Sequence, residues 1–291
     1  MGATKSRMLN QMRLKRLSLT LLALVLARAD NTCTTQPAER GPSPIKGHVI
    51  SCNEARWTAT AAHLRAYNIT PVKVACVPLD HDVIRLHPLV ALRPESAEQH
   101  AKFLSLTLSH RKAVLEVAFD SPDETPLQAS DEWGLIFEDD VAFHESLSPL
   151  QFHSLLNEAM ALSKESGFFY LGLCGPRCMP EEGQKLLRRC VGACAHAYAL
   201  SKRRALWFYQ EAMNALVTSS PDERDKVGSI HADIILAKLF ESRYAAGVPL
   251  PYLVGAGLHQ PGTHPTHFGA VYQDRRQFGS ELAPGAYAQY E

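Results

Sequence analysis

The sequence predicts an α/β fold built as a single domain. Three observations predict it: a strand–helix–strand unit that begins near residue 47, a long helix from about residue 97 to 119, and short apolar strands that follow this helix. The chain has 291 residues, of which 46% are hydrophobic, so one sizeable core can form. No internal repeat or low-complexity tract indicates another architecture.

The first unit begins at Gly47. Residues 48–51 are predicted as a strand, residues 55–67 have helical spacing of apolar side chains, and residues 72–77 are predicted as a second strand. Strand, helix and strand at this spacing form a βαβ unit, and such units build parallel sheets.

Alternation continues along the rest of the chain. Further strands are predicted at 133–137, 168–173 and 195–200, and further helices at 97–119, 150–163, after Ser201 and at 229–243. The tail beyond Gly255 is rich in glycine, proline and histidine, so it is predicted to be irregular.

The N-terminus predicts entry into the secretory pathway. Five basic residues precede an apolar run, Leu17 to Ala27, and a small-x-small pattern ends at Ala29. The run is shorter than the roughly 20 residues that span a bilayer. We expect residues 1–29 to be a cleaved signal peptide or a signal anchor, residues 30–46 to be a linker, and the protein to be lumenal (endoplasmic reticulum or Golgi) or secreted. No stable membrane span is expected unless the leader is retained as an anchor.

Cysteine content fits an oxidising compartment. In a secreted chain, disulfides are favoured for the two Cys-x3-Cys pairs, although their spacing also lies within the range of zinc sites. The pairing among Cys33, Cys52, Cys76, Cys174, Cys178, Cys190 and Cys194 stays open at this stage. The sequon at Asn68 makes the protein a candidate glycoprotein, although Pro71 follows it directly.

Charge composition argues against a nucleic-acid partner. Thirty basic residues balance thirty acidic ones, and no long basic stretch appears after the first sixteen residues. Proteins that bind nucleic acids usually carry a basic face.

Three consecutive acids, Glu138, Asp139 and Asp140, directly follow the apolar strand 133–137. Ligands in open α/β sheets bind at the carboxyl ends of the strands, where these acids are expected. Repulsion among the carboxylates would be relieved by a dication, and hard oxygen ligands suit Mn²⁺ or Mg²⁺. The alternative is a solvated acidic turn that caps the next helix.

Five segments together resemble the family 25 glycosyltransferases, which include bacterial lipooligosaccharide galactosyltransferases and animal collagen galactosyltransferases. The first two are a helix bearing Ser109-His110 and the strand that ends in Glu138-Asp-Asp-Val141. The others are His48-Val-Ile-Ser with Arg56 downstream, Phe169-Tyr-Leu-Gly172, and Gly192 to Ser201. The resemblance covers about residues 47 to 260.

The resemblance implies a GT-A fold, which is a Rossmann-type mixed sheet flanked by helices, over residues 47–291. It also implies a UDP-sugar donor and Mn²⁺ held by the acidic motif, with Asp140 as a direct ligand and Glu138 beside it. Arg56, Ser109, His110, Glu138 and Asp139 would bind the donor. GT-A enzymes often complete the metal site with a late histidine, so His259 is expected as a further ligand, with His264 and His267 as competitors.

Asp233 is the expected catalytic base. It shares a predicted helix face with apolar residues, and a partly buried carboxylate can deprotonate an acceptor hydroxyl. The alternative is that it only interacts favourably with the dipole of the helix. His110 is predicted to point inward, where it would be either a satisfied core residue or part of the donor pocket.

The expected function is transfer of galactose or glucose from a UDP-sugar to a hydroxyl of a glycan or protein, with inversion. One rival is a secreted, non-catalytic module on the same fold that binds a sugar nucleotide or a glycan. Another is a glycoside hydrolase, in which two separated carboxylates flank the bond. Three adjacent acids suit metal binding better than that geometry.

Overall fold

The computed structural model describes residues 45–91, 94–119, 132–180, 186–210, 231–259 and 267–274. The chain divides into two compact units, Met1–Ser43 and Pro44–Glu291, and all described residues belong to the second. The expected leader (1–29) and nearly all of the expected linker (30–46) lie outside the described residues. In the part of the chain that is described, no helix is long and apolar enough to cross a membrane.

The strands of the described part run in chain order as follows: β1 (Lys46–Ser51), β2 (Thr70–Ala75), β3 (Trp133–Glu138), β4 (Val141–Phe143), β5 (Phe168–Cys178), β6 (Leu187–Ser201), β7 (Tyr252–Val254), β8 (His267–Gly269) and β9 (Val271–Gln273). The helices are α2 (Glu54–Ala66), α3 (Asp82–Arg85), α4 (Pro88–Ala91), η1 (Pro94–Ser96), α5 (Ala97–Ala118), α6 (Pro149–Leu162), α7 (Lys202–Phe208) and α10 (Ala232–Ala245).

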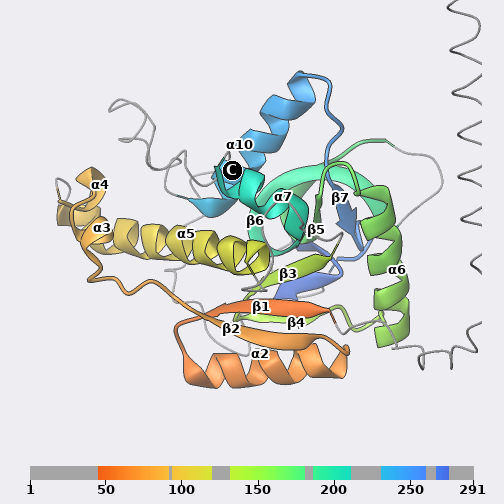
Figure 1. The fold of residues 1–291 in the computed structure, drawn as a ribbon, viewed down its shortest axis with the longest axis horizontal. Coiled ribbons are helices and arrows are strands. Elements are labelled where there is room, and N and C mark those ends of the chain that lie inside the picture. The colour runs from red at the N-terminus through yellow and green to blue at the C-terminus, as the bar shows by residue number, and fades with distance from the viewer. Residues whose placement is uncertain are drawn as a thin grey trace, which may run out of the picture. The chain divides into compact units, whose positions relative to one another are not determined.

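Seven of these strands form a mixed sheet with the order β2-β1-β3-β6-β7-β5-β8, in which β6 also pairs with β5, and β4 pairs separately with β9. Figure 1 shows β1, β2 and β3 side by side, with α2 below them. β1 is parallel to β2 and to β3, as the predicted βαβ unit requires. β6 is antiparallel to both β3 and β5. The predicted α/β class is therefore confirmed as a mixed sheet with helices around it.

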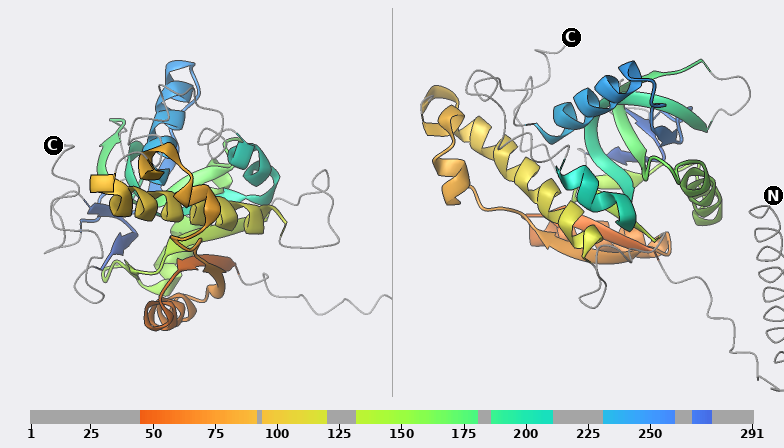
Figure 2. Two further views of the ribbon diagram at one scale, coloured as in Figure 1. Left: turned by 90° about the vertical axis from the view of Figure 1, so that its left-hand side faces the viewer. Right: turned by 45° about the horizontal axis from the view of Figure 1, so that its top comes forward.

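Strand β3 shows how the sheet is covered on both faces. Leu135 and Phe137 belong to one buried cluster with Leu64 of α2 and Phe152 of α6. Ile136 points the other way, into a cluster formed with α5, α7 and α10, which lie together in Figure 2. Because successive side chains of a strand alternate between faces, an uninterrupted apolar run fits a strand buried on both sides.

Two features of the second half depart from the predicted elements. The tail beyond Gly255 is not wholly irregular, because β8 and β9 form within it. β5 and β6 are longer than the predicted strands and include the cysteines. The glycine-rich and cysteine-rich composition concealed these strands, since their pairing depends on distant partners.

Disulfides join three pairs of cysteines within the described residues: Cys52–Cys76, Cys174–Cys194 and Cys178–Cys190. The first ties the end of β1 to the end of β2, and the other two tie β5 to β6. The expectation of disulfides for the Cys-x3-Cys pairs is confirmed, with each bond running between the pairs.

Candidate functional site

A cavity of about 430 Å³ opens where β1, β2 and β3 end. Its wall is formed by residues that follow these strands, by α5, and by the start of α10. One part of the lining is charged and polar, and another part is apolar, with Val77, Leu79, Phe103 and Leu106. In α/β proteins, ligands commonly bind in a crevice at the carboxyl ends of the strands.

Most of the side chains singled out in the sequence line this one cavity. They come from four segments far apart along the chain: Arg56, Ser109, His110, Glu138, Asp139, Asp140 and Asp233. His259 is not among the lining residues.

Glu138 is the last residue of β3 and is held from two sides. Nε2 of His110, in α5, lies 3.2 Å from its Oε1, and Nε2 of Gln273, in β9, donates to its Oε2 at 2.9 Å. Nδ1 of His110 lies 3.1 Å from the hydroxyl of Tyr198. His110 is fully buried, so the inward orientation predicted for it is found.

Burial and mutual contact shift the pKa values of the two groups that flank His110, Glu138 and Tyr198. Burial raises the pKa of Glu138, but the hydrogen bond and charge of His110, helped by His196 and Gln273, outweigh it, and the pKa lies below its ordinary value. Burial and the charge of Glu138 raise the pKa of Tyr198. Tyr198 therefore keeps its proton, and its hydroxyl lies within hydrogen-bond distance of Nδ1 of His110, whose Nε2 faces Glu138.

Asp139 is held by the first βαβ unit. Ser51, at the end of β1, donates to its Oδ2 at 2.6 Å, and Nη1 of Arg56 lies 3.7 Å from its Oδ1. Thr60 of α2 donates to its main-chain oxygen at 2.8 Å. The next residue, Asp140, accepts a main-chain hydrogen bond from Asp274 at 2.7 Å. The acidic turn is therefore fixed in place and half-buried, not a freely solvated loop.

Ser109 is bonded within the protein. Its hydroxyl donates to the carbonyl of Ser105 and accepts from the main-chain N–H of Val77, at 2.6 and 2.9 Å. Ser105 itself donates to the carbonyl of Val77. In this structure the two serines therefore hold the segment after β2 against α5, and through it they shape the apolar wall.

Asp233 lies in the first turn of α10 with 14% of its side chain exposed. Its Oδ2 accepts a hydrogen bond from the main-chain N–H of Cys194 at 3.1 Å, and Oδ1 accepts from the N–H of Ile234 at 2.8 Å. Nδ1 of His231 lies 3.8 Å from Oδ1. The carboxylate of Asp233 therefore contacts the N-terminal turn of α10 and also lines the cavity.

His259 lies in a different environment. It is exposed, its ring packs against Phe268, and its carbonyl oxygen accepts a hydrogen bond from His144. Of its two competitors, His264 lies outside the described residues, and His267 is buried beside a disulfide.

Sequence reasoning missed several polar lining residues, among them Asn53, Lys102, His231 and Gln273. Gln273 belongs to a segment predicted to be irregular, so no pattern indicated that it would reach Glu138. His231 could have been found, because it stands two residues before Asp233 at the start of the same predicted helix.

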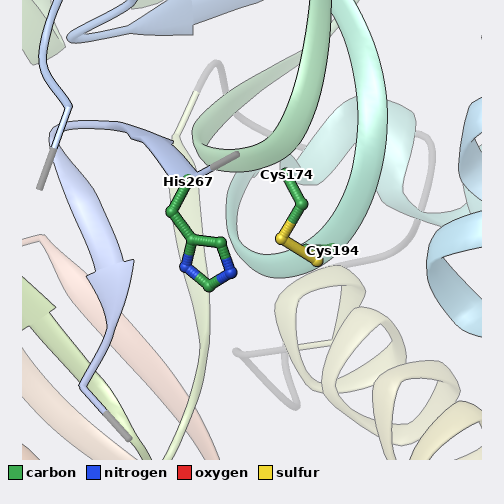
Figure 3. Close-up of side chains that lie close together, drawn as sticks. All are labelled: Cys174, Cys194 and His267. Atoms are coloured by element: carbon green, nitrogen blue, oxygen red, sulfur yellow. A yellow bond between two sulfur atoms is a disulfide. The ribbon is translucent and has the colours of Figure 1, made fainter. Parts of the chain in front are cut away.

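Cys174, Cys194 and His267 form another compact group, in which the sulfur and imidazole ligand atoms lie within 4.8 Å of one another (Figure 3). A metal binds thiolates, and here the two sulfurs are joined to each other. Only the reduced form would offer two thiolates and an imidazole, a set that suits Zn²⁺ rather than Mn²⁺.

Comparison with known proteins assigns no family to the chain: no protein-family model matches it, and no curated protein matches it.

Proposed function

We propose that the protein is a metal-dependent glycosyltransferase with a GT-A fold that transfers galactose or glucose from a UDP-sugar to a hydroxyl of a glycan or protein. The observation that carries the proposal is the shared cavity: the acidic turn after β3, Arg56, His110 and Asp233 line it together. Arg56, His110 and the acidic turn belong to segments that resemble family 25 glycosyltransferases, and Asp233 was selected because it shares a predicted helix face with apolar residues.

The candidate metal ligands fit a hard dication such as Mn²⁺ or Mg²⁺. Three consecutive carboxylates lie where β3 ends and the next turn begins. Hard cations prefer such oxygen ligands. Both oxygens of Glu138 and Oδ2 of Asp139 have hydrogen-bond partners in the protein. Asp140, which the resemblance implies as the direct ligand, lines the same cavity. When bound, the ion would neutralise the charge that develops on the departing nucleotide diphosphate.

The other residues have separate roles in this proposal. The His110–Glu138 pair and the Ser51–Asp139 bond hold the acidic turn in one geometry, so that little reorganisation is needed on binding. Arg56 lines the cavity beside Asp139 and would meet the phosphates of the donor. Asp233 would take the proton from the acceptor hydroxyl, which a single inverting displacement requires.

The proposed location is the lumen of the secretory pathway or the extracellular space. Disulfides persist in oxidising compartments, and the described residues contain three. Asn68 of the sequon is exposed in the turn between α2 and β2, where a glycan could be attached.

The test is release of UDP from UDP-galactose and from UDP-glucose with Mn²⁺. We expect Asp140→Asn to lower the rate by on the order of 100-fold, since one carboxylate ligand of the metal is lost. The matched control is Glu145→Gln, which changes an exposed acid outside the lining residues and should leave the rate unchanged. Nucleotide binding without turnover would favour the non-catalytic module, and sugar release that resists chelation would favour a hydrolase.

A further inference from the structure

The two disulfides between β5 and β6 differ in their surroundings. Cys178 and Cys190 stand directly opposite each other in the strand register. Cys174 is paired in register with Ala193, not with its disulfide partner Cys194, and the register shifts on both sides of Cys174. The regular ladder is therefore interrupted at Cys174–Cys194, and the covalent bond ties the strands at this point (Figure 3).

Cys194 has an unusual backbone conformation. Its φ is +60°, in the left-handed region that residues with a side chain rarely adopt. Such a conformation persists where the surroundings impose it. Here the side chain of Cys194 is buried and bonded to Cys174, so the disulfide is the constraint that acts directly on this residue.

The constrained backbone reaches the candidate base. The N–H of Cys194 donates to Oδ2 of Asp233 at 3.1 Å, and both residues line the cavity. An N–H donor stabilises an ionised carboxylate and restricts its side-chain orientation. The direction of this N–H depends on the φ and ψ angles near Cys194, so it depends on what holds them.

We propose that the Cys174–Cys194 disulfide is a positioning element for Asp233. It holds the main chain at Cys194 in the conformation that presents its N–H to the carboxylate. The catalytic consequence rests on the proposed function, because it requires Asp233 to act as the base. The structural consequence does not.

The molecule offers a matched control. Cys178–Cys190 ties the same two strands and closes a similar loop, but neither cysteine lines the cavity. Removing either disulfide loosens the same pair of strands. Only removal of Cys174–Cys194 releases the main-chain N–H of residue 194 that donates to Asp233.

The first measurement is steady-state release of UDP from UDP-galactose with Mn²⁺ and water as acceptor. In Cys174→Ala/Cys194→Ala we expect kcat to fall at least about tenfold, because the base is misplaced, with the donor KM within about twofold of the unaltered protein. Cys178→Ala/Cys190→Ala should keep its kcat. Equal kcat values for the two double variants would overturn the proposal.

A second measurement needs no activity. Hydrogen exchange at the amide of residue 194, followed by NMR, should be slow in the unaltered protein and in Cys178→Ala/Cys190→Ala. It should be on the order of tenfold faster in Asp233→Ala and in Cys174→Ala/Cys194→Ala, because the amide loses its acceptor. If the amide stays protected without the disulfide, the inference is wrong. If the unaltered protein releases UDP from neither UDP-galactose nor UDP-glucose, the proposed function is wrong, and this exchange experiment still decides the inference.

Discussion

Glu138 is the residue through which three distant segments meet at the cavity. His110 and Gln273 each donate to one of its oxygens, and the hydroxyl of Tyr198 contacts Nδ1 of His110. Leaving any of these buried groups without a partner would cost about 1–3 kcal/mol. The same arrangement that stabilises the fold therefore sets the position of the acidic turn.

The lowered pKa of His231 makes the free energy of unfolding depend on pH. Burial lowers its pKa, and His100 lowers it further against the opposing charge of Asp233, so the pKa lies below the ordinary 6.5. Below about pH 6.5, His231 is protonated in the unfolded chain but still neutral in the folded protein. The free energy of unfolding therefore falls as pH falls from about 6.5 toward the pKa of His231 in the folded protein.

We therefore expect His231→Gln to lose less stability than the unaltered protein between about pH 7 and about pH 5. Urea unfolding at a series of pH values measures this. The matched control is His81→Gln, at an exposed histidine outside the cavity lining. Parallel stability curves for His231→Gln and the unaltered protein would contradict the assignment.

At the scale of elements, the crossing of β5 with the segment of β8 and β9 determines whether Gln273 reaches Glu138. Gly172 makes this crossing possible. A Cβ atom at residue 172 would lie 2.1 Å from the carbonyl oxygen of Val271 and 2.2 Å from Nε2 of His196. Nε2 of His196 also lies 3.2 Å from that carbonyl oxygen, so neither atom can move away without disturbing the other.

We expect Gly172→Ala to lower the free energy of unfolding by about 3 kcal/mol, because the added methyl group has no space. Urea unfolding followed by circular dichroism gives the value. Gly247→Ala is the control, since nothing lies within 4 Å of its added Cβ and only backbone strain of about 1–2 kcal/mol is involved. An equal or smaller loss at residue 172 would show that the crossing is looser than described.

The elements differ in how far the sequence predicts them. β1, α2, β2, α5 and β3 were predicted to within about three residues, because each has an unbroken period or apolar run. β8 and β9 were missed, since strands of three residues owe their existence to pairing with β5 and β4. The hydrogen bond from Gln273 to Glu138 was missed for the same reason.

For the candidate site, the sequence predicted the side chains better than their partners. The acids after β3 stood out because polar residues interrupt a buried strand. The bond from Cys194 to Asp233 could not be predicted, since a main-chain donor leaves no signature in residue types. The expected ligand His259 depended on a resemblance alone, and no physical pattern tied it to the acidic turn.

For the whole molecule, the disulfides add stability to a core that is already extensive. Their sequence separations are 12, 20 and 24 residues, and closing loops of this size contributes about 3 kcal/mol each. We expect full reduction to lower Tm by at least about 10 °C, measured by calorimetry with and without a phosphine reductant. Cys178→Ala/Cys190→Ala should show a smaller shift. An unchanged Tm, with thiol titration showing all cysteines reduced, would contradict this.

The proposed function requires the acids at the end of β3 to hold a dication that binds the diphosphate of a nucleotide sugar. Isothermal titration calorimetry of UDP tests it most directly, with Mn²⁺ or with a chelator, on the unaltered protein and on Asp140→Asn. We expect UDP to bind in the presence of Mn²⁺, and to bind at least about tenfold more weakly on chelation and in Asp140→Asn, but not in Glu145→Gln. UDP binding that is absent with Mn²⁺, or that is indifferent to both the chelator and Asp140→Asn, would contradict it.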